Sequence, residues 1–193
     1  MSAFDPKRTL AAPRVEPVKL GHNNQESSSS ALRRLMNILT INLALSTFVF
    51  WIAAKLYVLP KLQGYEARAI LLPILLLHSL RHLGLMFLTS GATYPGIPPQ
   101  FTHPAAYGDL VTAVLAMIAI PAVATQVRSA KLLVCLFNVV GSLDLISAIT
   151  LATVYNAAPF MGPAYWIPAF WVPALLVTHY LTFLVLLRGR WPA

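Results

Sequence analysis

Long apolar runs dominate the chain after about residue 35, and short segments rich in proline, glycine or charge separate them. Five of these runs reach the roughly 20 residues that a helix needs to cross the hydrocarbon core of a bilayer. They lie at about 35–54, 69–89, 109–126, 132–154 and 165–187. The pattern predicts an all-α fold, namely a polytopic integral membrane protein with a bundle of five transmembrane helices in one domain, residues 35–190.

The segment before the first run, residues 1–34, has a different pattern. Basic residues alternate with prolines, and a polar stretch ends in the run Ser27–Ser30. Such a composition cannot bury a core, so we expect a disordered N-terminal tail. The tail has no apolar core of the kind found in a signal peptide, and its acids and prolines disfavour a presequence. A mispredicted start, with the true one at Met36, is the alternative.

Composition supports the membrane class, because 58% of the residues are hydrophobic and only 10% are charged, against about 25% charged in soluble domains. The net charge is +8, but the basic residues stand in ones and twos beside apolar runs. That distribution is typical of membrane flanks, so we expect the lipid bilayer and not nucleic acid as the partner. The single Cys135 excludes an internal disulfide and a cysteine-only metal cluster.

The basic residues also predict an orientation. One side of the predicted bundle holds Lys55, Lys61, Arg68, Arg128, Lys131, Arg188 and Arg190, whereas the two loops of the other side hold no lysine or arginine. Positive residues favour the cytoplasmic side. We therefore predict a multi-pass protein of a bacterial-type inner membrane, with its N-terminus outside and its C-terminus cytoplasmic; Arg33 and Arg34, beside the first run, argue the other way.

The two uncharged loops have related compositions. Residues 90–108 are dense in proline, with Pro95, Pro98, Pro99 and Pro104, and residues 155–164 combine proline with aromatic side chains. Because proline removes backbone donors and breaks helices, we expect both segments to be irregular. Irregular backbone is not tolerated against lipid, so both should lie together on the external face of the bundle.

The second apolar run carries His78, Arg81 and His82 near its middle. An arginine at the centre of a membrane helix costs about 2.5 to 3.5 kcal/mol on insertion scales, so it normally faces the protein interior and has a partner. Asp144 matches its depth, since each lies twelve residues from the predicted start of its helix. We favour Asp144 over Asp109, which the predicted helix bounds place at the external end of the third helix, where a carboxylate suits the helix dipole.

Helical spacing adds further polar groups to this pair. His78, Arg81 and His82 fall on one helix face, and His179 lies at a similar depth in the fifth run. The predicted polar cluster comprises His78, Arg81, His82, Asn138, Asp144, His179 and Tyr180. These groups either satisfy one another and fix the helix register, or line a pocket that binds or passes a small or amphipathic ligand.

Other functions remain open at this point. His78 and His179 could ligate a haem from two helices, although no cofactor and no other metal site is predicted. The chain lacks a signature such as H-E-x-x-H, so an enzyme is disfavoured and no catalytic residue is assigned. A structural role, in a homo-oligomer or a larger membrane complex, is the remaining class.

Overall fold

The structure is a computed structural model that describes residues 38–63 and 66–188. These residues are nearly all helical, and five of the helices are long and apolar enough to cross a membrane: Ile38–Lys61, Ala67–Leu88, Pro99–Ala124, Ala130–Val154 and Gly162–Arg188. The prediction of a helical chain with five such helices is confirmed for this part of the chain. The predicted tail, residues 1–34, and the alternative start at Met36 lie outside it.

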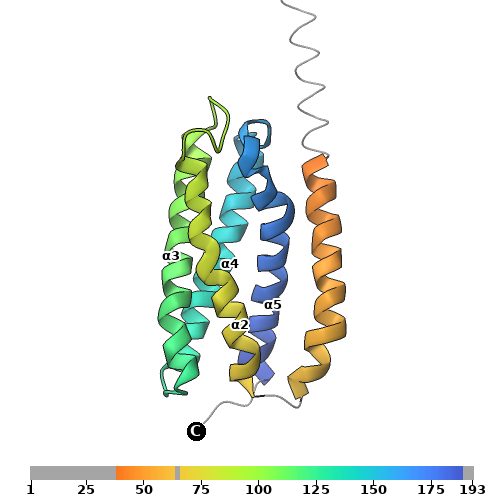
Figure 1. The fold of residues 1–193 in the computed structure, drawn as a ribbon, viewed down its shortest axis with the longest axis vertical. Coiled ribbons are helices and arrows are strands. Elements are labelled where there is room, and N and C mark those ends of the chain that lie inside the picture. The colour runs from red at the N-terminus through yellow and green to blue at the C-terminus, as the bar shows by residue number, and fades with distance from the viewer. Residues whose placement is uncertain (1–37, 64–65, 189–193) are drawn as a thin grey trace, which may run out of the picture.

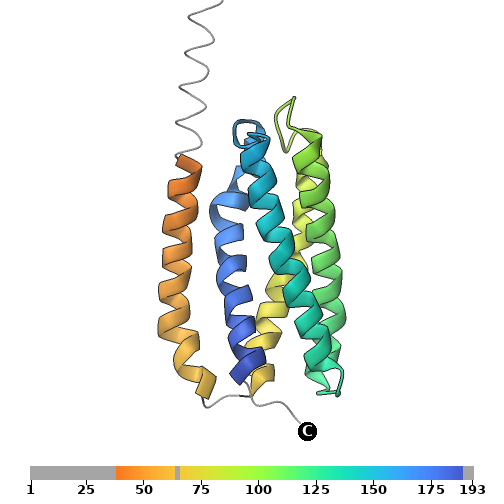
Figure 2. The same ribbon diagram turned by 180° about the vertical axis from the view of Figure 1, so that it is seen from behind.

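Four of the helices form a compact bundle (Figure 1). They are built around α2 (Ala67–Ser79), α3 (Pro99–Ala124), α4 (Ala130–Val154) and α5 (Val172–Arg188). The remaining helix, Ile38–Lys61, is the first in the chain and lies beside α5 at the edge opposite α3, as both views show (Figures 1 and 2). Only 6% of its most apolar stretch is buried. We call it the N-terminal helix.

Aromatic pairs connect the N-terminal helix to the last one. Phe50 packs edge-on against Phe170, and Trp51 packs edge-on against Tyr180, with ring centroids 5.3 Å apart in both pairs. Edge-to-face pairs at this separation are favourable by about 0.5 to 1.5 kcal/mol beyond the area they bury. The peripheral helix is therefore attached through a few large side chains.

Three of the spanning helices change their hydrogen-bonding pattern along their length. The N-terminal helix ends in a π segment, Ala54–Val58, and a 3₁₀ segment, Leu59–Gln63, and α2 continues as the 3₁₀ helix η3, Leu80–Leu88. The last begins with η5 (Gly162–Tyr165) and the π segment η6 (Ile167–Trp171) before α5. Proline removes a donor from the regular ladder, which explains the loose opening turns near Pro168 and Pro173.

Helix α3 begins at Pro99, whereas the sequence pattern placed its start at about 109 and treated residues 90–108 as irregular. Proline is favoured in the first helical turn, because its missing N–H would have no partner there and its φ angle is already helical. Pro98 is the extended cap and Pro99 the first helical residue. The dense prolines thus both end a loop and start a helix. As a result α3 is almost three turns longer at its N-terminus than the sequence pattern predicted.

The two loops at this end of the bundle are joined to each other. The amide of Tyr94 donates to the carbonyl of Phe160 at 2.8 Å, and the amide of Ala164 donates to the carbonyl of Ala92 at 2.9 Å. A short 3₁₀ turn, η4 (Ala158–Phe160), lies within the second loop. The two uncharged loops therefore cover the same end of the bundle, next to each other.

The buried side chains form two apolar clusters with a polar layer between them. One cluster lies toward the end opposite the loops and includes Leu71, Leu75, Ala116, Ala119, Val134, Phe137, Leu181 and Val185. The other lies toward the loops and includes Phe87, Phe101, Ala105, Leu145, Met161 and Leu175. On each of the four bundle helices, one buried polar residue lies close to the change from one cluster to the other: His78, Thr112, Asn138 and His179.

Candidate functional site: a buried arginine network

Arg81 occupies the centre of the polar layer. It lies in η3, its side chain is 0% exposed, and its guanidinium reaches toward α3, α4 and α5. Nε donates to Asp109 Oδ1 at 2.6 Å, and Nη2 donates to Asp144 Oδ2 at 2.5 Å. Nη1 contacts the Gly141 carbonyl at 3.2 Å and His179 Nε2 at 3.1 Å. Four of the five guanidinium N–H groups therefore have an acceptor.

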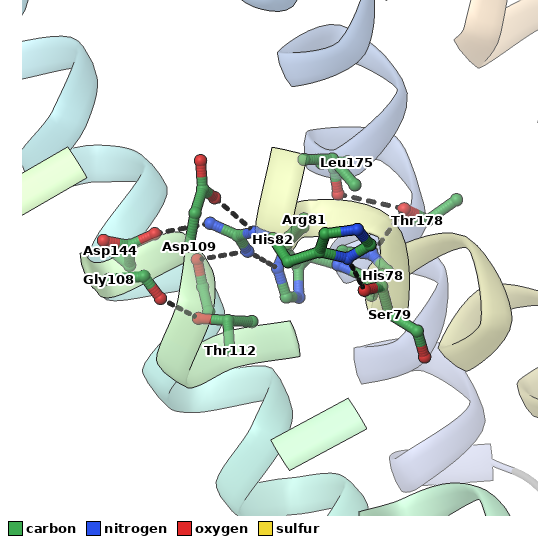
Figure 3. Close-up of polar contacts among 12 residues, drawn as sticks. His78, Ser79, Arg81, His82, Gly108, Asp109, Thr112, Asp144, Leu175 and Thr178 are labelled. Carbon is green, nitrogen blue, oxygen red and sulfur yellow. Dashed lines mark hydrogen bonds and ion pairs between the residues drawn. The ribbon is translucent and has the colours of Figure 1, made fainter. Parts of the chain in front are cut away.

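Two carboxylates flank the guanidinium, one from α3 and one from α4 (Figure 3). Asp109 lies ten residues after the start of α3, and Asp144 lies ten residues before the end of α4. At 1.5 Å per residue, both are about 15 Å from the loop end of the bundle. Their side chains are 14% and 12% exposed.

Asp109 is the alternative partner that the sequence interpretation ranked below Asp144. Its predicted place at the end of a helix followed from the misplaced start of α3. With α3 starting at Pro99, Asp109 lies well inside the helix and reaches Arg81 together with Asp144. Arg81 thus contacts Asp144, the favoured partner, and Asp109 as a second one.

His179 extends the network from α5. Its Nε2 faces an Arg81 N–H, so this nitrogen is the acceptor, and its Nδ1 carries the hydrogen toward Asn138 Oδ1 at 2.8 Å. These contacts assign a neutral ring with the proton on Nδ1. Asn138 is fully buried, and its Nδ2 has no hydrogen-bond partner among the described residues.

His78 lies beside this network rather than within it. Its Nε2 is 2.9 Å from Thr178 Oγ1, whose own hydrogen is directed to the Ala174 carbonyl at 2.8 Å. The histidine is therefore the donor in this pair, and its Nδ1 is an acceptor without a partner in the described chain. The His78 and His179 rings contact each other, with centroids 4.3 Å apart, and both pack against Phe137.

The two histidines do not fit the haem alternative in this arrangement. Axial ligands of one iron lie on opposite faces of a porphyrin, whereas these rings touch each other. Each Nε2 also already has a partner, Thr178 or Arg81. Among the described residues, no group of three His, Cys, Asp or Glu side chains could hold a metal ion.

Besides His78, two residues of the predicted cluster lie outside the network. His82 is half-buried, and its Nδ1 contacts the Ser79 carbonyl of its own helix at 2.9 Å. The 3₁₀ geometry of η3 rotates neighbouring residues by about 120°, which turns His82 away from the face of Arg81. Tyr180 is 46% exposed and packs against Trp51. It follows His179 in the chain but faces another side of α5.

Glycines make room for three of the polar side chains. A Cβ at Gly84 would overlap the Asp109 carboxylate, and a Cβ at Gly108 would overlap the Asp144 carboxylate. At Gly141 it would lie 2.6 Å from His179 Cε1. The network is therefore built on close approach of η3, α3, α4 and α5, with glycine at each point where a partner's side chain meets a helix backbone. Glycine spacing around the charged residues was the signal that the sequence interpretation did not use.

The comparisons with known proteins give a family without an assigned activity. Residues 38–187 match the model of a family described as a domain of unknown function (DUF8737). The chain belongs to this family. No curated protein and no solved structure matches it.

The DUF8737 match spans all five apolar helices, and every residue of the arginine network lies within it. It also includes the contact region between the N-terminal helix and the bundle, where two adjoining apolar cavities lie. The cavities have volumes of about 460 and 320 Å³ and share the lining residues Tyr57, Val58, Leu77, Thr178 and Leu181. We call them together the lateral crevice.

The wall of the lateral crevice includes a charged residue and a hydroxyl group next to His78. Lys61 lines its end opposite the loops, and Thr178 lines it next to His78. The chain of contacts from Thr178 through His78 to His179 then leads to Arg81. The crevice and the arginine network are thus neighbours that are separated by one layer of side chains.

Proposed function

We propose that the protein is an integral membrane protein that binds an amphipathic, lipid-like molecule in the lateral crevice. The observation that carries this proposal is an apolar cavity between helices with a basic residue, Lys61, at one end. The occupant is the acyl chain of a membrane phospholipid with an anionic headgroup. Its chain would lie along Leu77 and Leu181, and its headgroup near Lys61.

The proposed membrane setting rests on the five long apolar helices and on the basic residues at one end of them. Lys55, Lys61, Arg68, Arg128, Lys131 and Arg188 lie toward that end, whereas residues 89–98 and 155–161 contain no lysine or arginine. Positive residues favour the cytoplasmic side, so the loops would face outward and the C-terminus inward across an inner membrane. Anionic lipids are attracted to such a basic rim by about 1 kcal/mol for each basic residue near the surface.

The shape of the crevice supports an acyl chain over a compact metabolite. Its walls run along α2 from Ala69 to Leu77 and along the last helix from Phe170 to Leu181. The eleven residue steps from Phe170 to Leu181 correspond to about 16 Å, which is about half of a hydrocarbon core of roughly 30 Å. A ligand of this length would lie parallel to the helices within one leaflet.

Native mass spectrometry on detergent-purified protein tests this proposal. Wild-type protein is expected to retain one anionic phospholipid, and Leu77→Trp, which fills the crevice, should reduce the retained fraction at least several-fold. Leu143→Trp is the matched control, because Leu143 is 62% exposed on α4 and does not line the crevice. Lipid-free wild-type protein, or equal retention in both variants, would overturn the proposal.

A second pair of variants tests the headgroup position. Lys61→Gln should weaken binding of anionic lipid relative to zwitterionic lipid, whereas Lys131→Gln should not, because Lys131 lies at the same end but does not line the crevice. Equal effects of the two substitutions would indicate general surface attraction. A structural subunit of a larger complex would instead purify with a stoichiometric partner chain and without bound lipid.

A further inference from the structure

The arginine network contains more acid than base. Two carboxylates, Asp109 and Asp144, contact one guanidinium, Arg81. His179 is neutral in the network, because its Nε2 accepts from Arg81. With both carboxylates ionised, the layer would carry one uncompensated negative charge about 15 Å from the loop end of the bundle.

We propose that the network is a proton-binding site in which one proton is shared by the Asp109 and Asp144 pair. The step is a simple protonation: a carboxylate oxygen takes up one hydrogen ion, and no other bond changes. Uncompensated charge in a desolvated site is costly, and two carboxylates that share one site do not both ionise readily. With one proton bound, the remaining carboxylate and Arg81 balance each other.

The contacts identify where the proton can reside. Arg81 binds one oxygen of each acid, which leaves Asp109 Oδ2, beside Gly84, and Asp144 Oδ1, beside Gly108. Both side chains keep partial exposure, whereas Arg81 has none. The two carboxylate side chains are therefore the accessible part of the network.

The other titratable groups near the site are less favourable places for the proton. His179 would have to give up its contact with Arg81 to accept a proton on Nε2. His78, from α2, is fully buried between Phe137 and His179 and donates to Thr178, and His82 contacts the Ser79 carbonyl. A proton on either ring of the touching His78 and His179 pair would add positive charge close to Arg81, whereas a proton on a carboxyl removes an excess charge.

A second observation shows that this layer is not saturated by its own groups. His78 Nδ1 and Asn138 Nδ2 are buried within completely buried residues and have no partner in the described chain. Buried polar atoms are normally satisfied. This unpartnered acceptor and this unpartnered donor belong to residues that contact His179, which contacts Arg81, and a hydrogen-bonded path for a proton through the layer would use such groups.

Infrared spectroscopy of the full chain in lipid nanodiscs tests the proposal. A carbonyl stretch of a protonated carboxyl is expected at neutral pH, and biosynthetic labelling with isotope-labelled aspartate should shift it. Of the three aspartates, Asp5 lies outside the described residues, so the labelled protein carries Asp5→Asn and a shifted band then reports on Asp109 or Asp144. The band should disappear in Asp109→Asn and in Asp144→Asn but persist in Glu66→Gln, which removes an exposed acid outside the network.

If Asp109→Asn and Asp144→Asn fail to fold, the labelled protein that retains both acids still decides between the outcomes. Absence of a shifted carboxyl band at neutral pH would overturn the proposal. Loss of the band when sodium replaces choline in the buffer at fixed pH would also overturn the proposal. In that case a metal cation, and not a proton, would compensate the charge of the second carboxylate. The site rests on the network alone and stands or falls independently of lipid binding in the lateral crevice.

Discussion

The carboxylate of Asp144 lies directly against the α carbon of Gly108, at the place where any larger residue would carry its Cβ. This contact brings α3 and α4 close enough for Asp144 to reach Arg81 on a third helix. Small residues at helix contacts allow the backbones to approach closely, as in many membrane helix pairs. The relationship makes the polar network dependent on residues that have no polar side chain.

Gly108→Ala should therefore destabilise the protein, although alanine is the better helix former. Alanine gains about 0.5 to 1 kcal/mol of helix propensity over glycine, whereas overpacking a well-packed site costs about 1 to 3 kcal/mol. Because the added Cβ would overlap the Asp144 carboxylate, we expect the overpacking cost to exceed the gain in helix propensity. Thermal unfolding in detergent should show a lower midpoint, and adding Asp144→Ser, which shortens the clashing side chain, should restore part of it. No recovery in the double variant would contradict this account.

Single removal of either acid should be tolerated better than removal of both. Asp109→Asn or Asp144→Asn leaves Arg81 one carboxylate, whereas the double variant leaves a buried charge without a counter-ion, which costs about 3 to 5 kcal/mol. The loss in thermal stability should exceed the sum of the single effects. Arg81→Gln should be severe by itself and partly recovered by Asp109→Asn with Asp144→Asn. Additive losses throughout the cycle would show that the acids do not share one partner.

The sequence allowed the centre of this network to be located but not its full membership. The cost of an arginine inside an apolar run required a partner, and helical depth pointed to Asp144 and His179. Asp109 was misassigned because Pro98 and Pro99 were interpreted as loop residues, although they start α3. His82 was included because regular α-helical spacing was assumed, and the change to 3₁₀ geometry depends on tertiary contacts that a single sequence does not reveal.

The two buried histidines should differ in their importance for stability. His179→Phe removes an acceptor from Arg81 and a donor from Asn138, and an unsatisfied buried polar group costs about 1 to 3 kcal/mol. His78→Phe loses one hydrogen bond, to Thr178, and also removes the unpartnered Nδ1, so its cost should stay near 1 kcal/mol. Chemical or thermal unfolding of the two variants compares them directly. A larger loss for His78→Phe would contradict the assignment of His179, and not His78, to the arginine network.

The proposed orientation predicts which residues can be labelled from outside the cell. In a Cys135→Ala background, Tyr94→Cys should react with a membrane-impermeant maleimide on intact cells, because Tyr94 is exposed in the loop that joins η3 to α3. Lys131→Cys, at the opposite end of the bundle, should react only after the membrane is permeabilised. The reverse pattern would place the loops in the cytoplasm and give Arg33 and Arg34 the deciding role in the charge asymmetry. Because the two sites lie at opposite ends of the helix bundle, one pair of variants distinguishes the two orientations.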